Sequence, residues 1–179
     1  MRKIGTLIIM SSLFMFSCKS KNGNGSDQGE TKTPETTTQD QKPGITSQPK
    51  TYKVVFSPDS ALLGKKNEAL IKITGATAVA LQDPDGKDNG IELTVKLTVT
   101  NKEKIGSSSN LHVDYPNSRL QLDNGTNTVC DTGTDFLRAA PESTSKEESW
   151  VYKIPAGTKP TALNLFMDDT RVSVSVSLN

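Results

Sequence analysis

Apolar and polar side chains alternate strictly along several stretches of this chain after residue 50. The clearest stretch spans residues 91–100, where every odd position is apolar and every even one is polar. The same period of two returns over residues 172–178, where three serines separate four apolar residues. Because successive side chains of a β-strand point to opposite faces, this pattern predicts antiparallel strands with one buried and one solvated face.

Shorter and less regular stretches add further predicted strands. They span residues 52–56, 69–80, 119–122, 126–131, 150–154 and 162–166. No long apolar stripe of helical period appears, and the pattern predicts at most one short helical turn, around residues 134–139. About seven or eight short strands with turns between them predict an all-β fold, an immunoglobulin-like antiparallel β-sandwich over residues 51–179.

Turn sequences separate these strands at residues 83–86, 123–125 and 167–170. Asn124-Gly125 predicts a two-residue hairpin loop, because this pair adopts the backbone conformation that such loops require. Asp168 and Asp169 are expected to be solvated turn residues, because neighbouring side chains at a strand end diverge and are poorly placed for paired acid–base chemistry.

The first acidic turn also holds the weak metal candidates of this sequence. Asp83, Asp85 and Asp88 could offer several oxygen ligands to calcium. The spacing of an EF-hand is not met, since Lys87 stands at the fifth position and no glutamate closes the loop. A turn held by aspartate and glycine is therefore the favoured interpretation, with a metal site as the alternative.

The first 50 residues have a different composition. Arg2 and Lys3 precede an apolar run that ends at Phe16, which is the pattern of a secretory signal. The run is shorter than the roughly 20 residues that a helix needs to cross a bilayer. From Lys19 to about Lys50 the only apolar side chain other than proline is Ile45. Such a segment predicts a disordered tether, with a root-mean-square span of about 30 Å.

Met15-Phe16-Ser17-Cys18, at the end of the apolar run, resembles the lipobox of bacterial lipoprotein precursors. The resemblance implies that residues 1–17 are removed as a signal peptide and that Cys18 carries acyl chains such as palmitate. Residues 18–50 would then tether the folded domain to a membrane. Because Lys19 rather than aspartate follows the cysteine, the family's sorting rule implies the outer membrane of the cell envelope. An ordinary cleaved signal followed by a chance cysteine is the alternative.

A second resemblance covers roughly residues 68–179. It is carried by a strand that closes on Asn101-Lys102, by Leu120-Gln121-Leu122-Asp123-Asn124-Gly125, and by the segment 150–160. These are similar to the telokin-like immunoglobulin-fold domains of bacterial secreted proteins and lipoproteins, a domain of unknown function. The polar insert at 136–149 departs from that pattern. The family carries no catalytic residues, so the resemblance implies a non-catalytic module.

Charge and chemistry-bearing residues exclude several classes of function. A formal net charge of +1, from 21 basic and 20 acidic residues, speaks against nucleic-acid binding. His112 is the only histidine, and no hydrolase or metalloprotease motif is present. The chain is therefore predicted not to be an enzyme and to need no cofactor. If Cys18 is lipidated, Cys130 has no disulfide partner, and it is predicted to be a core residue.

One pair of aromatic residues is a candidate docking patch. Trp150 and Tyr152 share one face of a predicted strand by the period-two rule. An internal strand would place both rings in the core, which is the favoured interpretation, whereas an edge strand would expose them to a partner.

Together these observations predict a membrane-anchored envelope lipoprotein. Its sandwich would bind another envelope protein or a cell-surface polymer through loops or an exposed strand edge. The alternative is a small-ligand or calcium-binding lipoprotein that uses its acidic turns.

Overall fold

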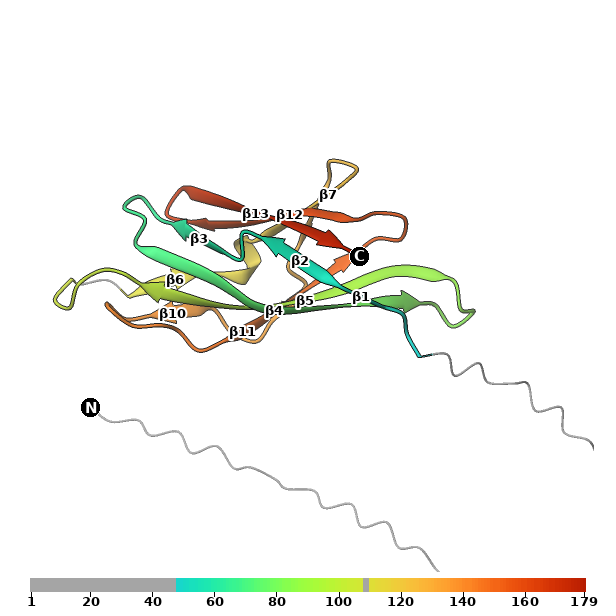
Figure 1. Ribbon diagram of the computed structural model, residues 1–179, viewed down its shortest axis with the longest axis horizontal. Helices are drawn as coiled ribbons and strands as arrows, with labels where there is room; N and C mark the ends of the chain where they lie inside the picture. Colours follow the sequence, from blue (N-terminus) through green and yellow to red (C-terminus); the bar gives the residue numbers. More distant parts are fainter. Residues whose placement is uncertain (1–47, 108–109) are drawn as a thin grey trace, which may run out of the picture. The chain divides into compact units, whose positions relative to one another are not determined.

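The computed structural model describes residues 48–107 and 110–179 (Figure 1). All of them belong to one compact unit, Ile45–Asn179. The predicted leader, Cys18 and nearly all of the predicted tether lie outside the described residues. Within the described part, no helix has both the length and the apolar character needed to cross a bilayer.

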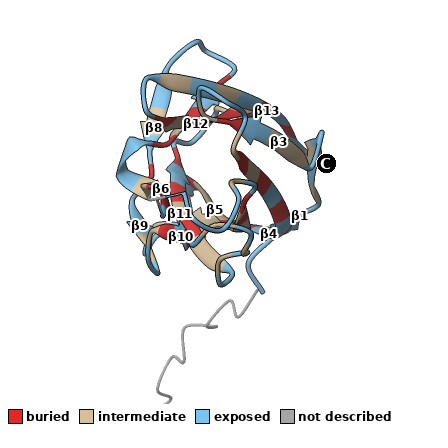
Figure 2. Cartoon of the chain, turned by 90° about the vertical axis from the view of Figure 1, so that its left-hand side faces the viewer, coloured by how far each residue is buried: buried red, intermediate tan, exposed pale blue. Residues whose placement is uncertain are grey.

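Antiparallel strands make up most of the described chain, and two facing sheets hold nearly all of them (Figure 2). Sheet A has six strands: β1 (Thr51–Tyr52), β3 (Ser60–Leu63), β4 (Ala69–Gln82), β5 (Asp88–Asn101), β9 (Thr132–Gly133) and β11 (Glu148–Ile154). Sheet B has five strands, in the order β2 (Val54–Ser57), β13 (Thr170–Leu178), β12 (Pro160–Met167), β7 (Arg119–Leu122) and β8 (Asn127–Val129). The predicted all-β sandwich is thus confirmed.

Two short elements complete the sandwich. Strands β6 (Leu111–Val113) and β10 (Leu137–Ala139) pair with each other as a separate two-stranded sheet. A single 3₁₀ turn, η1 (Tyr115–Asn117), leads directly into β7. Thirteen strands are present in the described residues, against the predicted seven or eight. The one helical turn that the sequence allowed around residues 134–139 does not form there: residues 137–139 are strand β10, and the 3₁₀ turn of the described residues is η1.

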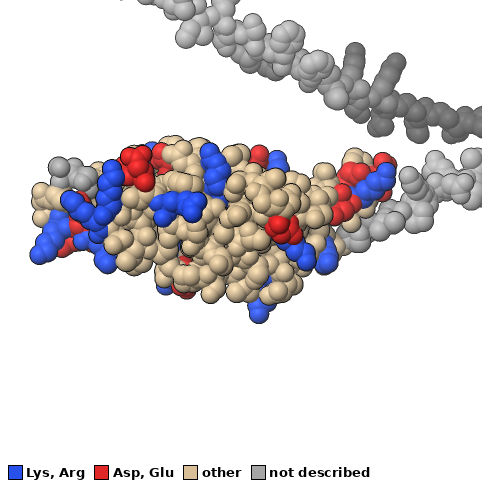
Figure 3. Space-filling view, turned by 90° about the horizontal axis from the view of Figure 1, so that it is seen from above, with Lys and Arg blue, Asp and Glu red and all other residues tan. Residues whose placement is uncertain are grey.

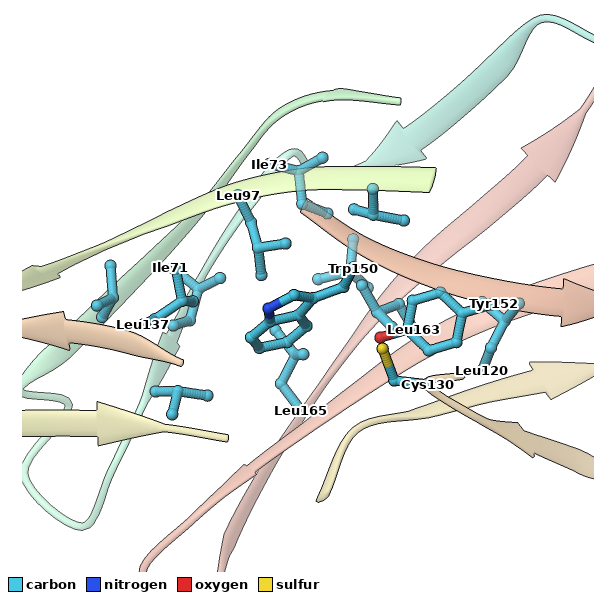
Figure 4. Close-up of a cluster of buried hydrophobic side chains, with 14 of the residues drawn as sticks. Ile71, Ile73, Leu97, Leu120, Cys130, Leu137, Trp150, Tyr152, Leu163 and Leu165 are labelled. Atoms are coloured by element: carbon cyan, nitrogen blue, oxygen red, sulfur yellow. The ribbon is translucent and has the colours of Figure 1, made fainter. Parts of the chain in front are cut away.

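The predicted alternation accounts for the core. On β5 the side chains of Leu93, Val95, Leu97 and Val99 are buried, while the residues between them face solvent. On β11 the same rule buries Trp150, Tyr152 and Ile154. Figure 4 shows the Trp150 ring of sheet A lying against Leu165 of sheet B. One apolar layer is therefore shared by the two sheets, as expected for a sandwich.

Both margins of the sandwich are formed by segments that change sheets. The segment 51–63 pairs first with β4 of sheet A, then with β13 of sheet B, and then again with β4. On the other side, β8 pairs with β7 of sheet B, and β9 then pairs with β11 of sheet A. The outermost strands of the two sheets are only two to four residues long, which limits edge-to-edge pairing.

The hairpin loop at residues 123–125 is longer than its sequence predicts. At 123–125 the Gly125 N–H donates to the Leu122 carbonyl and the Leu122 N–H donates to the Thr126 carbonyl. Gly125 has a φ of +81°, so this is a three-residue loop with glycine in the left-handed position. The predicted two-residue loop at Asn124-Gly125 is therefore wrong. A two-residue loop occurs instead between Met167 and Thr170, where Asp168 and Asp169 have φ of +48° and +62°.

Candidate functional site

Trp150 and Tyr152 do not form a docking patch. Both side chains are fully buried, and β11 lies between β5 and β9 rather than at an edge. The Trp150 Nε1–H donates to the Asp135 carbonyl at 3.1 Å, and the Tyr152 hydroxyl pairs with Ser118 Oγ at 2.7 Å. Burial raises the pKa of the Tyr152 hydroxyl well above its usual value. The core interpretation of these rings is confirmed.

Cys130 is a buried residue with an unreactive thiol. Its Sγ–H donates to the Thr132 carbonyl at 3.1 Å, and burial raises the pKa of the thiol to about 11. Since the thiolate is the nucleophilic form, this side chain is inert near neutral pH. Within the described residues it forms no disulfide.

The acidic turn uses its carboxylates to hold its own backbone. Asp83 Oδ1 accepts hydrogen bonds from the backbone N–H groups of Asp85 (3.0 Å) and Lys87 (2.8 Å). Asp88 Oδ1 accepts one from the Gly90 N–H at 2.9 Å. Among residues 48–107 and 110–179, no group of three or more acidic, histidine or cysteine side chains is arranged to hold a metal ion. Asp83 and Asp88 therefore act here as turn-forming residues.

The outer face of sheet A carries paired charges between threonine and valine positions. Lys96 pairs with Glu147 at 3.4 Å, and Lys153 pairs with Asp131 at 2.9 Å. Strand register also places Lys153 directly opposite Glu92 on β5. Opposite charges on this face thus neutralise one another, as is common on the solvated side of an antiparallel sheet.

The outer face of sheet B is built differently. One row of paired residues crosses all five strands, and a second, neighbouring row crosses four. The first row is Ser57, Ser175, Ala162, Gln121 and Asn127, and the second is Ser173, Asn164, Arg119 and Val129. Beyond them lie the pairs Arg171–Phe166 and Ser177–Val55. None of these outward positions carries a carboxylate, and uncharged side chains make up most of this side in Figure 3.

A shallow hollow of about 290 Å³ lies on this face, lined by Asn117, Arg119 and Phe166. Arg119 comes from the start of β7, Phe166 from the neighbouring strand β12, and Asn117 from η1. The Arg119 Nη1 donates to the carbonyls of Pro116 and Ser118, both at 2.7 Å. Ser118 is itself buried and is hydrogen-bonded to Tyr152, so the core fixes the loop that orients the guanidinium.

Sequence reasoning missed this hollow, although part of its signal was present. Leu120 and Leu122 are inward residues of the predicted strand 119–122, so Arg119 had to face outward. The same parity places Phe166 outward on a strand whose Leu163 and Leu165 are buried. An aromatic residue on an otherwise polar face was therefore visible, but its proximity to Arg119 depends on the pairing of β7 with β12.

A second hollow, of about 460 Å³, lies at one end of the sandwich. Its lining includes Tyr52, Ile91 and Leu178, together with Lys50 and Lys159. The Lys50 ammonium sits 4.8 Å from the centre of the Tyr52 ring. A side chain of the protein itself thus already covers the aromatic surface that a ligand would use there.

Neither family models, nor curated proteins, nor solved structures contain a match to this chain. The resemblances to lipoprotein precursors and to telokin-like domains accordingly stay predictions from the sequence.

Proposed function

We propose that the chain is a lipoprotein of the bacterial cell envelope whose sandwich binds a cell-surface polysaccharide. In this proposal residues 1–17 are cleaved, lipid on Cys18 anchors the protein in the outer membrane, and residues 18–50 form the tether. The short apolar run that ends in Ser17-Cys18 and the polar segment after it support the anchor.

One observation carries the binding function, namely the outer face of sheet B, whose outward positions are mostly neutral and include no carboxylate. Its exposed polar side chains, such as Ser175, Gln121 and Asn127, offer both donors and acceptors of hydrogen bonds, as do the hydroxyl groups of a sugar polymer. Five strands at a spacing of about 4.8 Å give a surface roughly 20 Å wide. An extended glycan could lie across such a surface and stack one ring on Phe166.

A protein partner fits this surface less well. Protein interfaces are enriched in aromatic and apolar anchors at their centre. On this face Val55 and Val129 are exposed at opposite margins, and Phe166 is the single aromatic among the outward positions of the five strands. The outermost strands are also only two to four residues long, so each offers little backbone for strand addition.

The lipid anchor is tested by labelling growing cells with an alkyne analogue of palmitate. We expect the wild-type protein to take up the label and to sediment with membranes, and Cys18→Ala to lose both properties. Cys130→Ala is the matched control, because Cys130 is buried within the sandwich, and it should keep the label. Label that persists in Cys18→Ala would refute the anchor.

The binding face is tested with purified full-length mature protein in detergent and polysaccharides isolated from the cell envelope. Ala162 lies in the middle of the sheet B face, between Ser175 and Gln121. We expect Ala162→Tyr to weaken binding at least about tenfold, because the ring blocks the middle of the sheet B face. The matched control is Thr94→Tyr in the middle of sheet A, where Thr94 lies between Thr77 and Val151.

Two results would overturn this function. The first is an absence of binding to any envelope polysaccharide while an envelope protein is captured with defined stoichiometry. The second is a loss of binding in Thr94→Tyr with none in Ala162→Tyr, which would move the site to sheet A.

A further inference from the structure

We infer that Asn117, Arg119 and Phe166 form a subsite for a sugar ring that bears an anionic group, either a carboxylate or a phosphate. This inference rests on the proposed polysaccharide-binding function and names the class of sugar that the face selects. The subsite is the hollow of about 290 Å³ described above.

The guanidinium of Arg119 is oriented before any ligand arrives. An arginine side chain has five N–H donors in one plane. Nη1 uses its donors on the carbonyls of Pro116 and Ser118, which fixes that plane. Within the described residues, Nε and Nη2 make no hydrogen bond to the protein. These remaining donors form the fork that binds two oxygens of a carboxylate or a phosphate.

No acidic side chain already occupies this fork. None of the ion pairs of the described residues involves Arg119. The outward positions around it are Asn164, Val129 and Gln121, all of them uncharged. Arg171, opposite Phe166, adds a second positive charge to the same face. The local charge is thus complementary to an anion.

Arg138, by contrast, already has an acidic partner within the protein. Its guanidinium lies 5.4 Å from the centre of the Phe136 ring, and it pairs with Asp135 at 3.8 Å. Arg119 and Phe166 line one hollow together, but Arg119 has no such carboxylate. An anionic sugar would supply the missing acidic group. Its ring would pack on Phe166, and its hydroxyls would reach the amide of Asn117.

The test uses the full-length mature protein in detergent and three small probes: glucuronate, glucose and glucose 6-phosphate. Binding is followed by NMR, through the Arg119 Nε–H and the Phe166 ring resonances, at low salt. We expect a charged probe to bind at least about tenfold more tightly than glucose and to shift both sets of resonances. The tighter of glucuronate and glucose 6-phosphate then identifies the anionic group.

Variants separate the subsite from general electrostatics. Arg119→Gln should remove the preference for the charged probe, and Arg119→Lys should restore only part of it, since a lysine lacks the planar fork. Arg138→Gln is the matched control and should leave the preference unchanged. Thermal unfolding of each variant checks that it is folded, and Phe166→Ala provides a second disruption that leaves the Arg119 contacts in place.

Equal affinity of the wild-type protein for glucose and both charged probes would overturn the subsite, as would equal effects of Arg119→Gln and Arg138→Gln. These failures differ from failure of the proposed function. If the wild-type protein binds polysaccharide, if Ala162→Tyr abolishes this binding, and if charged sugars are not preferred, only the subsite is refuted. If the protein binds glucuronate but no envelope polysaccharide, the subsite is supported and the polymer is refuted as its ligand.

Discussion

The two outer faces of this sandwich both meet water, but they are made soluble in different ways. Sheet A carries lysines and acidic residues that pair with one another, as in Lys96–Glu147 and Lys153–Asp131. Sheet B carries rows of serine, glutamine and asparagine, with two arginines and no carboxylate at its outward positions.

Charged groups on sheet A pair with one another, whereas none of the ion pairs of the described residues involves Arg119 on sheet B. A polymer that docks on sheet A must first displace ion pairs and their bound water, which costs free energy. In the proposed complex, the neutral hydroxyl and amide groups of sheet B would exchange water for sugar hydroxyls at little cost. Arg119 would gain an acidic partner without giving one up. The contrast therefore supports the proposal that the ligand binds sheet B.

The largest expected effect tests whether the two faces belong to one cooperative unit. Leu165 of β12 is fully buried, and it packs under Trp150 of sheet A (Figure 4). Leu165→Ala should lower the free energy of unfolding by about 2–5 kcal/mol, because it removes apolar contacts and leaves a cavity. Fluorescence of Trp150, the only tryptophan of the chain, and far-UV circular dichroism during urea unfolding measure the change.

The two signals should shift together to the same lower midpoint. A tryptophan transition that stays at the wild-type urea concentration while circular dichroism shifts would show that sheet A folds independently. The comparison of the two faces would then concern two separate layers rather than two sides of one domain.

Much of this fold could be predicted from the period of two alone. The inward residues of β5, β11 and β13 follow directly from the alternation, since a strand offers a side chain only two faces. The strands β6 and β10 were missed because three residues are too few to show a period. The changes of sheet near Lys53 and Cys130 were missed because hydrogen bonds to different partners leave the alternation unaltered.

The turns and the hollow mark the limit of local reasoning. Asn124-Gly125 suits a two-residue loop, yet the register of β7 and β8 requires three residues. Asp168 and Asp169 adopt the left-handed conformation without glycine, because β12 and β13 pair up to Met167 and Thr170. The hollow brings Arg119 next to Phe166 only through the pairing of β7 with β12, and no local sequence signal encodes that pairing.

A smaller effect should follow from placing one carboxylate on the face that lacks them. Gln121 is two residues from Arg119 on the same side of β7, about 7 Å away. Gln121→Glu should weaken binding of the anionic probe about threefold, because two unit charges 7 Å apart in water interact by about 0.6 kcal/mol. Titration calorimetry at low ionic strength measures the loss, and added salt should reduce it.

Gln82→Glu is the matched substitution on sheet A, at the exposed end of β4. It adds the same charge without approaching Arg119, so the affinity for the probe should be unchanged. Equal losses in the two variants would mean that net charge, rather than the sheet B face, controls binding.

The smallest expected effect concerns the pKa of Glu147 on the sheet A side of the molecule. The pKa of Glu147 lies below its usual value of 4.5, first because the Thr74 hydroxyl donates a hydrogen bond to the carboxylate at 2.7 Å and then because Lys96 is close. A carboxyl whose pKa is lowered by folding stabilises the folded state above pH 4.5, and this contribution is lost as the pH falls through the lowered value. Thr74→Val and Lys96→Met should each move the pKa of Glu147 back towards 4.5. Carbon-13 NMR titration of the Glu147 carboxyl measures both shifts. An unchanged pKa in Thr74→Val would show that charge pairing, rather than the hydroxyl, holds this carboxylate on the sheet A face.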